Sequence, residues 1–214
     1  MPRLTKRLET IVSELYKVKV FADIGCDHGY VAEAMLKSGK CDQAIITDVS
    51  AACLKKAEDL LKADFKGRYI SVVADGFNGV PPSDEALIAG MGGELIISIL
   101  KSADALPNIL ALQPMKNTDK VRSFLIKSGY KLIKDYLFKA EGKFYDFILA
   151  VKGEEEKPYT EKEIRFGRGN LSGKCEDFKE YILLKRRSLE NALKAAGEEN
   201  ASEIAIKLSE YENL

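Results

Sequence analysis

The feature that most constrains the fold is a regular alternation of short apolar runs with helix-like segments. Strand-like apolar runs occur at residues 18–25, 43–50, 68–77, 85–93 and 108–115. Amphipathic segments with helical spacing follow at residues 30–39, 50–63, 94–103 and 118–129. Repeated strand–helix units favour a parallel sheet with helices on both faces. The pattern therefore predicts a doubly wound, Rossmann-like α/β domain.

Two further strands are expected at residues 130–140 and 143–153, without a helix between them. The short turn that joins them implies an antiparallel hairpin. We therefore expect seven strands, mostly parallel, with an antiparallel edge strand. Ser50 and Thr118 are the expected N-caps of the helices that follow them. An amphipathic helix over residues 3–16 is expected to precede the first strand.

A shift to charge and proline at residues 153–163 indicates a domain boundary. Two helical patterns follow, at residues 177–197 and 201–214, and they break at Gly197. They predict a small, coiled-coil-like helical hairpin. We therefore expect a ligand-binding domain over residues 1–152 and a helical domain over residues 153–214.

Composition narrows the class of partner and the compartment. Basic and acidic residues both number 33, so any basic footprint for a nucleic acid must be local. Four scattered cysteines and one histidine cannot assemble a zinc site, and they favour a reducing compartment. No apolar run approaches the ~20 residues that span a bilayer, and the first residues lack a signal-peptide core. We expect a cytoplasmic protein without metal or membrane partner, and favour a monomer.

Ligands of open α/β sheets bind beyond the carboxyl ends of the strands. The five segments at these positions read DIGCDHG, DVS, DGF, GMGG and QPMKN. Asp48 lies 19 positions beyond Gly29, a spacing that suits a carboxylate accepting hydrogen bonds from ribose hydroxyls. Asp75 follows the third strand, where it is placed to accept from an adenine amino group, with the Gly76 backbone beside it.

The first of these loops excludes two common nucleotide-binding motifs. It lacks the three glycines of a G-x-G-x-x-G fingerprint and the G-K-[ST] of a Walker loop. An NAD enzyme is therefore poorly supported. Asp23, Gly25 and Gly29 instead fit the looser D-x-G-x-x-x-G pattern of methyltransferases that use S-adenosylmethionine.

The motifs DIGCDHGY, TDVS, ADGF, AGMGGE and QP occur in that order. With them the chain resembles class I methyltransferases and, more narrowly, the bacterial tRNA (adenine-22-N1)-methyltransferase family, over essentially its whole length. The resemblance implies S-adenosylmethionine as cofactor, tRNA as partner and methyl transfer to N1 of adenine 22.

The resemblance also implies which residues hold the cofactor. Residues of the first loop are expected near its methionine part, and the third and fourth segments are expected at its adenine and sulfonium. The implied set is Asp23, Gly25, Cys26, Asp27, His28, Asp48, Val49, Asp75, Gly76, Gly90, Met91, Gly92 and Gly93. Asp27 stands where general class I enzymes have glycine, and its carboxylate is a candidate partner of the cofactor's ammonium group. Whether Asp27 and His28 face the cofactor or the incoming adenine stays open.

Adenine N1 is largely unprotonated at neutral pH, so its attack on a sulfonium methyl group needs no general base. The expected task of the protein is alignment. Met91, Gln113, Pro114 and Asn117 are the candidates for holding the adenine; Asn117 stands in for the asparagine expected at Met115. Phosphate contacts are assigned to basic residues, namely Arg7, Lys116, Lys120, Arg122, Lys185, Arg186 and Arg187.

Two other functions fit parts of the pattern. One is a methyltransferase of the same fold that acts on a small molecule or a protein, which a tail unable to bind RNA would favour. The other is a non-catalytic RNA-binding module with a relic pocket. Intact Asp48, Asp75 and glycine loops argue against the relic, since a relic need not keep them.

Overall fold

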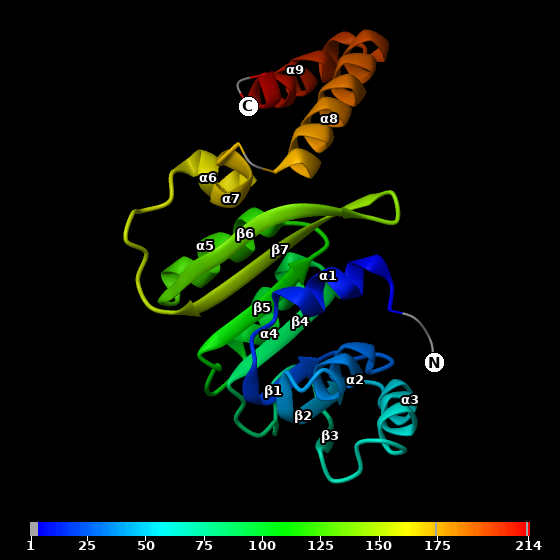
Figure 1. Cartoon of the computed structure of the whole chain (residues 1–214). Coiled ribbons are helices and arrows are strands. Elements are labelled where there is room, and N and C mark those ends of the chain that lie inside the picture. Colours follow the sequence, from blue (N-terminus) through cyan, green and yellow to red (C-terminus); the bar gives the residue numbers. More distant parts are fainter. Residues whose placement is uncertain (1–3, 174, 213) are drawn as a thin grey trace.

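A computed structural model describes residues 4–173, 175–212 and 214. The described residues form one seven-stranded sheet with the order β3-β2-β1-β4-β5-β7-β6 (Figure 1). The strands are β1 (Val18–Ile24), β2 (Cys41–Asp48), β3 (Tyr69–Val73), β4 (Glu85–Met91), β5 (Ile109–Pro114), β6 (Tyr130–Ala140) and β7 (Lys143–Lys152). β1 to β5 pair in parallel, and β7 runs antiparallel to both of its neighbours. The predicted fold is confirmed, with β7 inserted one position in from the β6 edge.

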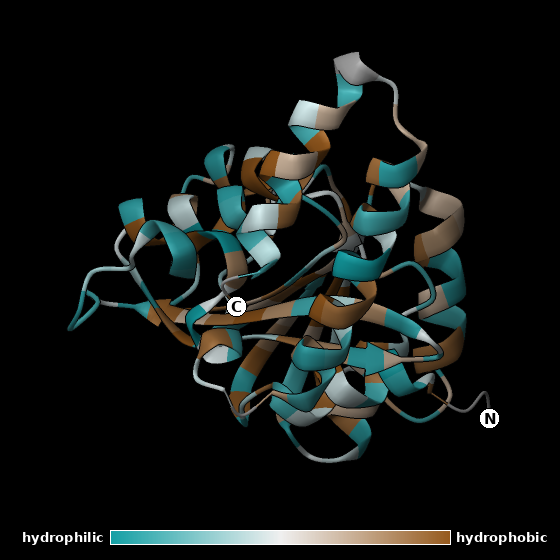
Figure 2. Ribbon diagram, turned by 90° about the horizontal axis from the view of Figure 1, so that it is seen from above, coloured by the Kyte–Doolittle hydropathy of each residue, from teal (hydrophilic) through white to brown (hydrophobic). Residues whose placement is uncertain are grey.

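Side-chain alternation along the strands builds a core on each face of the sheet. In β2, Ala44 and Ile46 belong to one core and Ile45 to the other. The first core takes residues from α1 (Lys6–Glu14), α2 (Tyr30–Lys37) and α3 (Ala51–Leu61). The second takes residues from α4 (Gly93–Lys101) and α5 (Thr118–Lys127). The helices therefore cover both faces, and apolar residues gather along the strands between them (Figure 2).

Helix starts follow the sequence in two cases and depart from it in one. Ser50 caps α3 by accepting from the Cys53 N–H group, as predicted. α1 starts at Lys6 after the cap Thr5, within the expected helix, of which residue 3 lies outside the described residues. The prediction for Thr118 is wrong because Asn117 occupies the cap position of α5 in a left-handed conformation.

The described residues after β7 form the helices α6 (Glu161–Phe166), α7 (Arg168–Leu171), α8 (Glu176–Ala195) and α9 (Glu198–Glu212). The two long predicted helices correspond to α8 and α9, which pack together away from the sheet (Figure 1). A third core of Leu137, Phe166, Phe178 and Ile182 joins these helices to β6. Among the described residues, no helix is long and apolar enough to cross a membrane.

Glu85 predicts a pH dependence of stability. It is fully buried at the start of β4, and its carboxylate accepts the Tyr16 N–H at 3.1 Å. Burial raises the pKa of Glu85 from 4.5 to about 7. The folded protein therefore keeps this proton between these pH values while the unfolded chain releases it. Stability falls as the pH rises from 4.5 to 7 and stops falling above that.

We expect Glu85→Gln to remove this loss, which amounts to roughly 3 kcal/mol. Urea denaturation of both proteins at pH 5 and pH 8 measures it. The gain in unfolding free energy at pH 5 should be larger in the wild type than in the variant. Equal gains in the two proteins would contradict the buried, protonated state of Glu85.

Candidate cofactor and substrate site

The loop after β1 turns sharply through three residues with left-handed backbone. Gly25, Asp27 and Gly29 have φ values of 74°, 50° and 72°. The N–H groups of Gly25 and Cys26 both donate to the Thr47 carbonyl, at 2.9 and 2.8 Å. The loop is thereby tied to the end of β2.

Asp48 at the end of β2 holds the same loop from the other side. Its carboxylate accepts the Ser50 N–H at 2.8 Å and the Asp27 N–H at 3.2 Å. A carboxylate offers about four lone-pair sites, so two remain after these bonds. The half-buried Asp48 can still accept from two hydroxyl groups of a ligand. Its predicted ribose contact is therefore chemically feasible.

Asp23 in β1 and Asp27 in the loop have different environments. Asp23 is buried beneath the loop and accepts from the Ala32 backbone, and burial raises its pKa to about 7. Asp27 is exposed, and its carboxylate lies 2.8 Å from Nδ1 of His28. The His28 ring stacks on Tyr30 with 5.5 Å between the ring centroids. His28 is thus held in place by both of these neighbours.

A cavity of about 340 Å³ joins the loop after β1 to the end of β4. This volume lies within the roughly 300–1,000 Å³ range of ligand sites. We call it the cofactor cavity; its lining includes Arg7, Asp23, Gly25, Cys26, Asp27, His28, Tyr30, Gly90 and Met91. A Cβ on Gly25 would lie 2.2 Å from the terminal methyl group of Met91, so these two residues face each other. The structure thus brings together the first and fourth predicted segments.

Arg7 reaches the cofactor cavity from α1 and is fixed there. Its Nη1 donates to Oε1 of Gln113 at 2.6 Å, and its guanidinium lies 5.7 Å from the centroid of the Tyr145 ring. Gln113 is fully buried, and its Nε2 donates to the Pro114 carbonyl and the Met115 sulfur. The buried Gln113 is therefore placed to orient Arg7, and the adenine contacts of Gln113 and Pro114 stay predictions.

Comparison with known proteins agrees with this geometry. A family described as "Methyltransferase domain" matches residues 4–148. The tRNA (adenine(22)-N(1))-methyltransferase of Bacillus subtilis is 31% identical over 163 residues, which are 73% of this chain and 68% of that protein. The chain belongs to this methyltransferase family. Its resemblance in the strand-end motifs is thereby confirmed.

Solved structures of other proteins show the same fold. A Streptococcus pneumoniae protein in complex with S-adenosyl-L-methionine has a TM-score of 0.88 at 24% identity, and 99% of each chain is covered. An M. capricolum protein in complex with S-adenosyl-homocysteine has a TM-score of 0.88 at 20% identity, with 98% of this chain and 96% of that chain covered.

The residues present in this methyltransferase fit S-adenosylmethionine. Asp48 offers free lone pairs for hydroxyl groups, and the exposed Asp27 carboxylate suits an ammonium group. The Arg7 guanidinium suits a carboxylate. Gly90 leaves an open face, because a Cβ there would meet only Arg7, at 3.6 Å. The donor set and the glycine cradle therefore match the charged and polar ends of this cofactor.

Gly92 and Gly93, which follow Met91, lie against the segment after β5. A Cβ on Gly93 would lie 2.6 Å from the Asn117 carbonyl oxygen, and its N–H donates to the Lys116 carbonyl. A Cβ on Gly92 would lie 3.2 Å from the Lys116 side chain. Gly93 packs α4 against the segment after β5, and its contact with the cofactor stays a prediction. Gly92 also contacts this segment.

Val49 of the second segment and Asp75 and Gly76 of the third are not among the described residues that line the cofactor cavity. Asp75 is exposed, and Val49, which follows β2, is 68% exposed. Gly76 is buried with φ of 61°, where a Cβ would lie 2.8 Å from the Ile99 side chain. Gly76 is therefore explained by packing on α4. The adenine contacts of these residues stay predictions.

The prediction that Arg122 contacts an RNA phosphate is wrong. Its side chain is 1% exposed and its Nε lies 2.6 Å from the Asp135 carboxylate, so it cannot reach a phosphate. Lys120 is exposed and pairs with Glu94 at 2.5 Å. The other contacts stay predictions; Lys116, Lys185 and Arg187 are exposed and Arg186 is half-buried.

Tyr30 lines the cofactor cavity and Tyr145 lies beside Arg7, and neither was predicted. Tyr30 ends the motif DIGCDHGY, so the signal was present. Tyr145 comes from the hairpin strand β7, and nothing in its neighbourhood along the chain indicates a place beside Arg7. Among the described residues, no group of three or more potential ligands could hold a metal ion.

Proposed function

We propose that this chain transfers a methyl group from S-adenosylmethionine to N1 of adenine 22 in tRNA. The observation that carries the proposal is the cofactor cavity, which joins the family's DIGCDHGY loop to Gly90 and Met91 beside a fixed arginine. Membership of the family supports the same reaction, which is the one named for the Bacillus subtilis relative.

The bound cofactor supplies a methyl group on a sulfonium centre, which is already activated for displacement. The residues of this chain supply positioning, which can lower a barrier by roughly 7 to 11 kcal/mol. Arg7, in the first turn of α1, is held by Gln113 and Tyr145, and Met91 fills the space against Gly25. This fixed wall limits how the adenine can enter.

No residue of the cavity is needed as a base, because the N1 lone pair is free at neutral pH. His28 is engaged by Asp27 and stacked on Tyr30. These contacts suit the pair to holding the methionine end of the cofactor. The adenine must leave its stack to reach the cavity, at a cost of a few kcal/mol.

The partner in this proposal is a cytoplasmic tRNA bound by a monomer. The C-terminal helices would form a second domain over residues 153–214. This domain would bind the body of the tRNA. Lys185, Arg186 and Arg187 on α8 support this role because exposed and half-buried cations can reach phosphates.

Incubation with methyl-labelled S-adenosylmethionine, bulk tRNA and, separately, bulk protein and small metabolites tests the class of substrate. Label is expected in the tRNA alone. Label in protein or metabolites alone would favour the other methyltransferase function. Binding of tRNA without any transfer would favour the relic module.

A further inference from the structure

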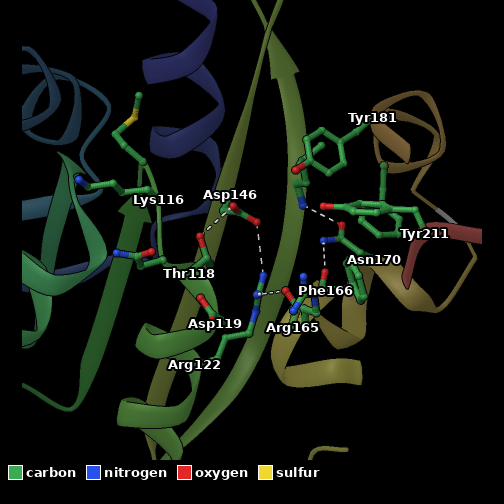
Figure 3. A pocket seen from close by; sticks show the side chains of 14 residues that line it. Lys116, Thr118, Asp119, Arg122, Asp146, Arg165, Phe166, Asn170, Tyr181 and Tyr211 are labelled. Carbon is green, nitrogen blue, oxygen red and sulfur yellow. Dashed lines mark hydrogen bonds and ion pairs between the residues drawn. The ribbon is translucent and has the colours of Figure 1, made fainter. Parts of the chain in front are cut away.

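A second cavity of about 340 Å³ lies between the sheet and the C-terminal helices. Among the described residues, its lining shares no member with that of the cofactor cavity. One wall is residues 115–119, the segment after β5. The facing walls come from β6, β7 and the helices α6 to α9, with Asp146, Tyr181 and Tyr211 directed inward (Figure 3).

The polar groups of this second cavity suit the edge of a nucleobase. The Asp146 carboxylate accepts from Thr118 at 2.8 Å and from Arg122 at 3.3 Å. Its side chain is 29% exposed, and lone-pair sites remain for a ligand. Tyr181 and Tyr211 direct their hydroxyl groups toward the side that Asp146 occupies (Figure 3). A hydroxyl donates and accepts, so the cavity offers both kinds of partner.

The aromatic rings that carry these hydroxyl groups are themselves fixed. Tyr211 meets Phe166 edge to face at 5.5 Å, and Tyr181 stacks on Phe178 at 6.3 Å. Phe166 and Phe178 belong to the buried core that joins the helices to β6. The hydroxyl groups are therefore preorganised, which lowers the entropic cost of binding a ligand.

Charge at the cavity suits a ligand that carries a phosphate group. Lys116 is exposed on the wall formed by residues 115–119, and Arg165 is 50% exposed on α6. Arg165 pairs with Glu210 and lies over the Phe166 ring. A base edge facing Asp146 and a phosphate facing Lys116 would satisfy both sides of one nucleotide.

The two cavities flank a single segment of chain. Residues 115–119 directly follow Gln113 and Pro114, and Gln113 holds Arg7 in the cofactor cavity. Gly92, next to Met91, packs against the Lys116 side chain. An RNA strand that delivers an adenine to the cofactor cavity would therefore run past the second cavity.

We propose that the second cavity binds one unstacked nucleotide of the tRNA, different from the adenine that is methylated. This inference rests on the proposed function. Binding of this second nucleotide contributes to the affinity for tRNA. It also selects which adenine along the RNA reaches the cofactor, while the methyl transfer itself takes place in the cofactor cavity.

The double variant Tyr181→Phe/Tyr211→Phe tests the proposal, because it removes both hydroxyl groups and keeps both rings. Two hydrogen bonds are lost, so the KM for a tRNA transcript should rise roughly 5- to 100-fold. The kcat and the affinity for S-adenosylmethionine should stay within about twofold of the wild type. Tyr16→Phe, on the exposed end of the α1 segment, is the matched control and should change neither constant.

An unchanged KM for tRNA in the double variant overturns the proposal. A lower kcat at unchanged KM also overturns it, because the cavity would then hold the reacting adenine. Lys116→Ala changes an exposed side chain and gives a second test that does not depend on the helices; an unchanged KM there excludes the phosphate contact. Methylation of tRNA by the wild-type protein tests the proposed function separately. That function fails if no methyl group enters the tRNA.

Discussion

Replacing Asp48 by alanine will weaken the binding of S-adenosylmethionine by at least roughly 100-fold. The carboxylate holds the cofactor loop through the Asp27 and Ser50 N–H groups and keeps lone pairs for two ribose hydroxyls. A hydrogen bond to a charged group contributes about 1.5 to 3 kcal/mol, so two of them exceed a factor of 100 in affinity. Titration calorimetry with the purified chain measures the dissociation constant directly.

Asp59→Ala is the matched control, because this carboxylate lies on the exposed face of α3 and pairs with the surface lysines Lys55 and Lys62. Its affinity for the cofactor should equal that of the wild type. Undiminished binding by Asp48→Ala would rule out the ribose contact and leave Asp48 as a structural residue of the loop.

Replacing Arg122 by alanine will lower the free energy of unfolding by about 3 to 5 kcal/mol, because it leaves the Asp135 carboxylate buried without its partner. Arg122 also donates to the Ile164 and Arg165 carbonyl groups at the end of α6, at 3.1 and 3.2 Å. The side chain therefore joins α5, β6 and the C-terminal helices. Urea denaturation followed by circular dichroism measures the loss.

Lys120→Ala, one of the same group of basic residues, is the control for Arg122→Ala. Its pair with Glu94 lies on the surface and is screened by solvent, so the variant should unfold close to the wild-type midpoint. Wild-type stability of Arg122→Ala together with a loss of tRNA affinity would restore the original assignment of Arg122 to a phosphate.

The features that were predicted correctly from the sequence are those determined by neighbouring residues. The strand–helix alternation, the cap at Ser50 and the strand-end loops depend on residues close together in the chain, and the structure confirms them. The short helix α6 could also have been found, because Thr160 and Glu163 form a capping box. Its T-x-x-E signature is present in the segment interpreted as a domain boundary.

Pairings over long distances along the sequence could not be read in this way. Arg122 looks like any surface cation until β6 places Asp135 beside it. The carbonyl groups of Lys116 and Asn117, which would crowd a side chain on Gly93, come from a distant part of the chain. Arg7, which donates to Gln113, lies 106 positions away from it. Each of these contacts involves a partner that only the fold supplies.

Methylation of two tRNA transcripts that differ only at position 22 tests the proposed reaction. After incubation with S-adenosylmethionine, mass spectrometry of the nucleosides should find N1-methyladenosine in the transcript with adenine 22. The transcript with guanine at this position should contain none. Equal N1-methyladenosine in both transcripts, or none in either, would contradict the proposed methylation of adenine 22.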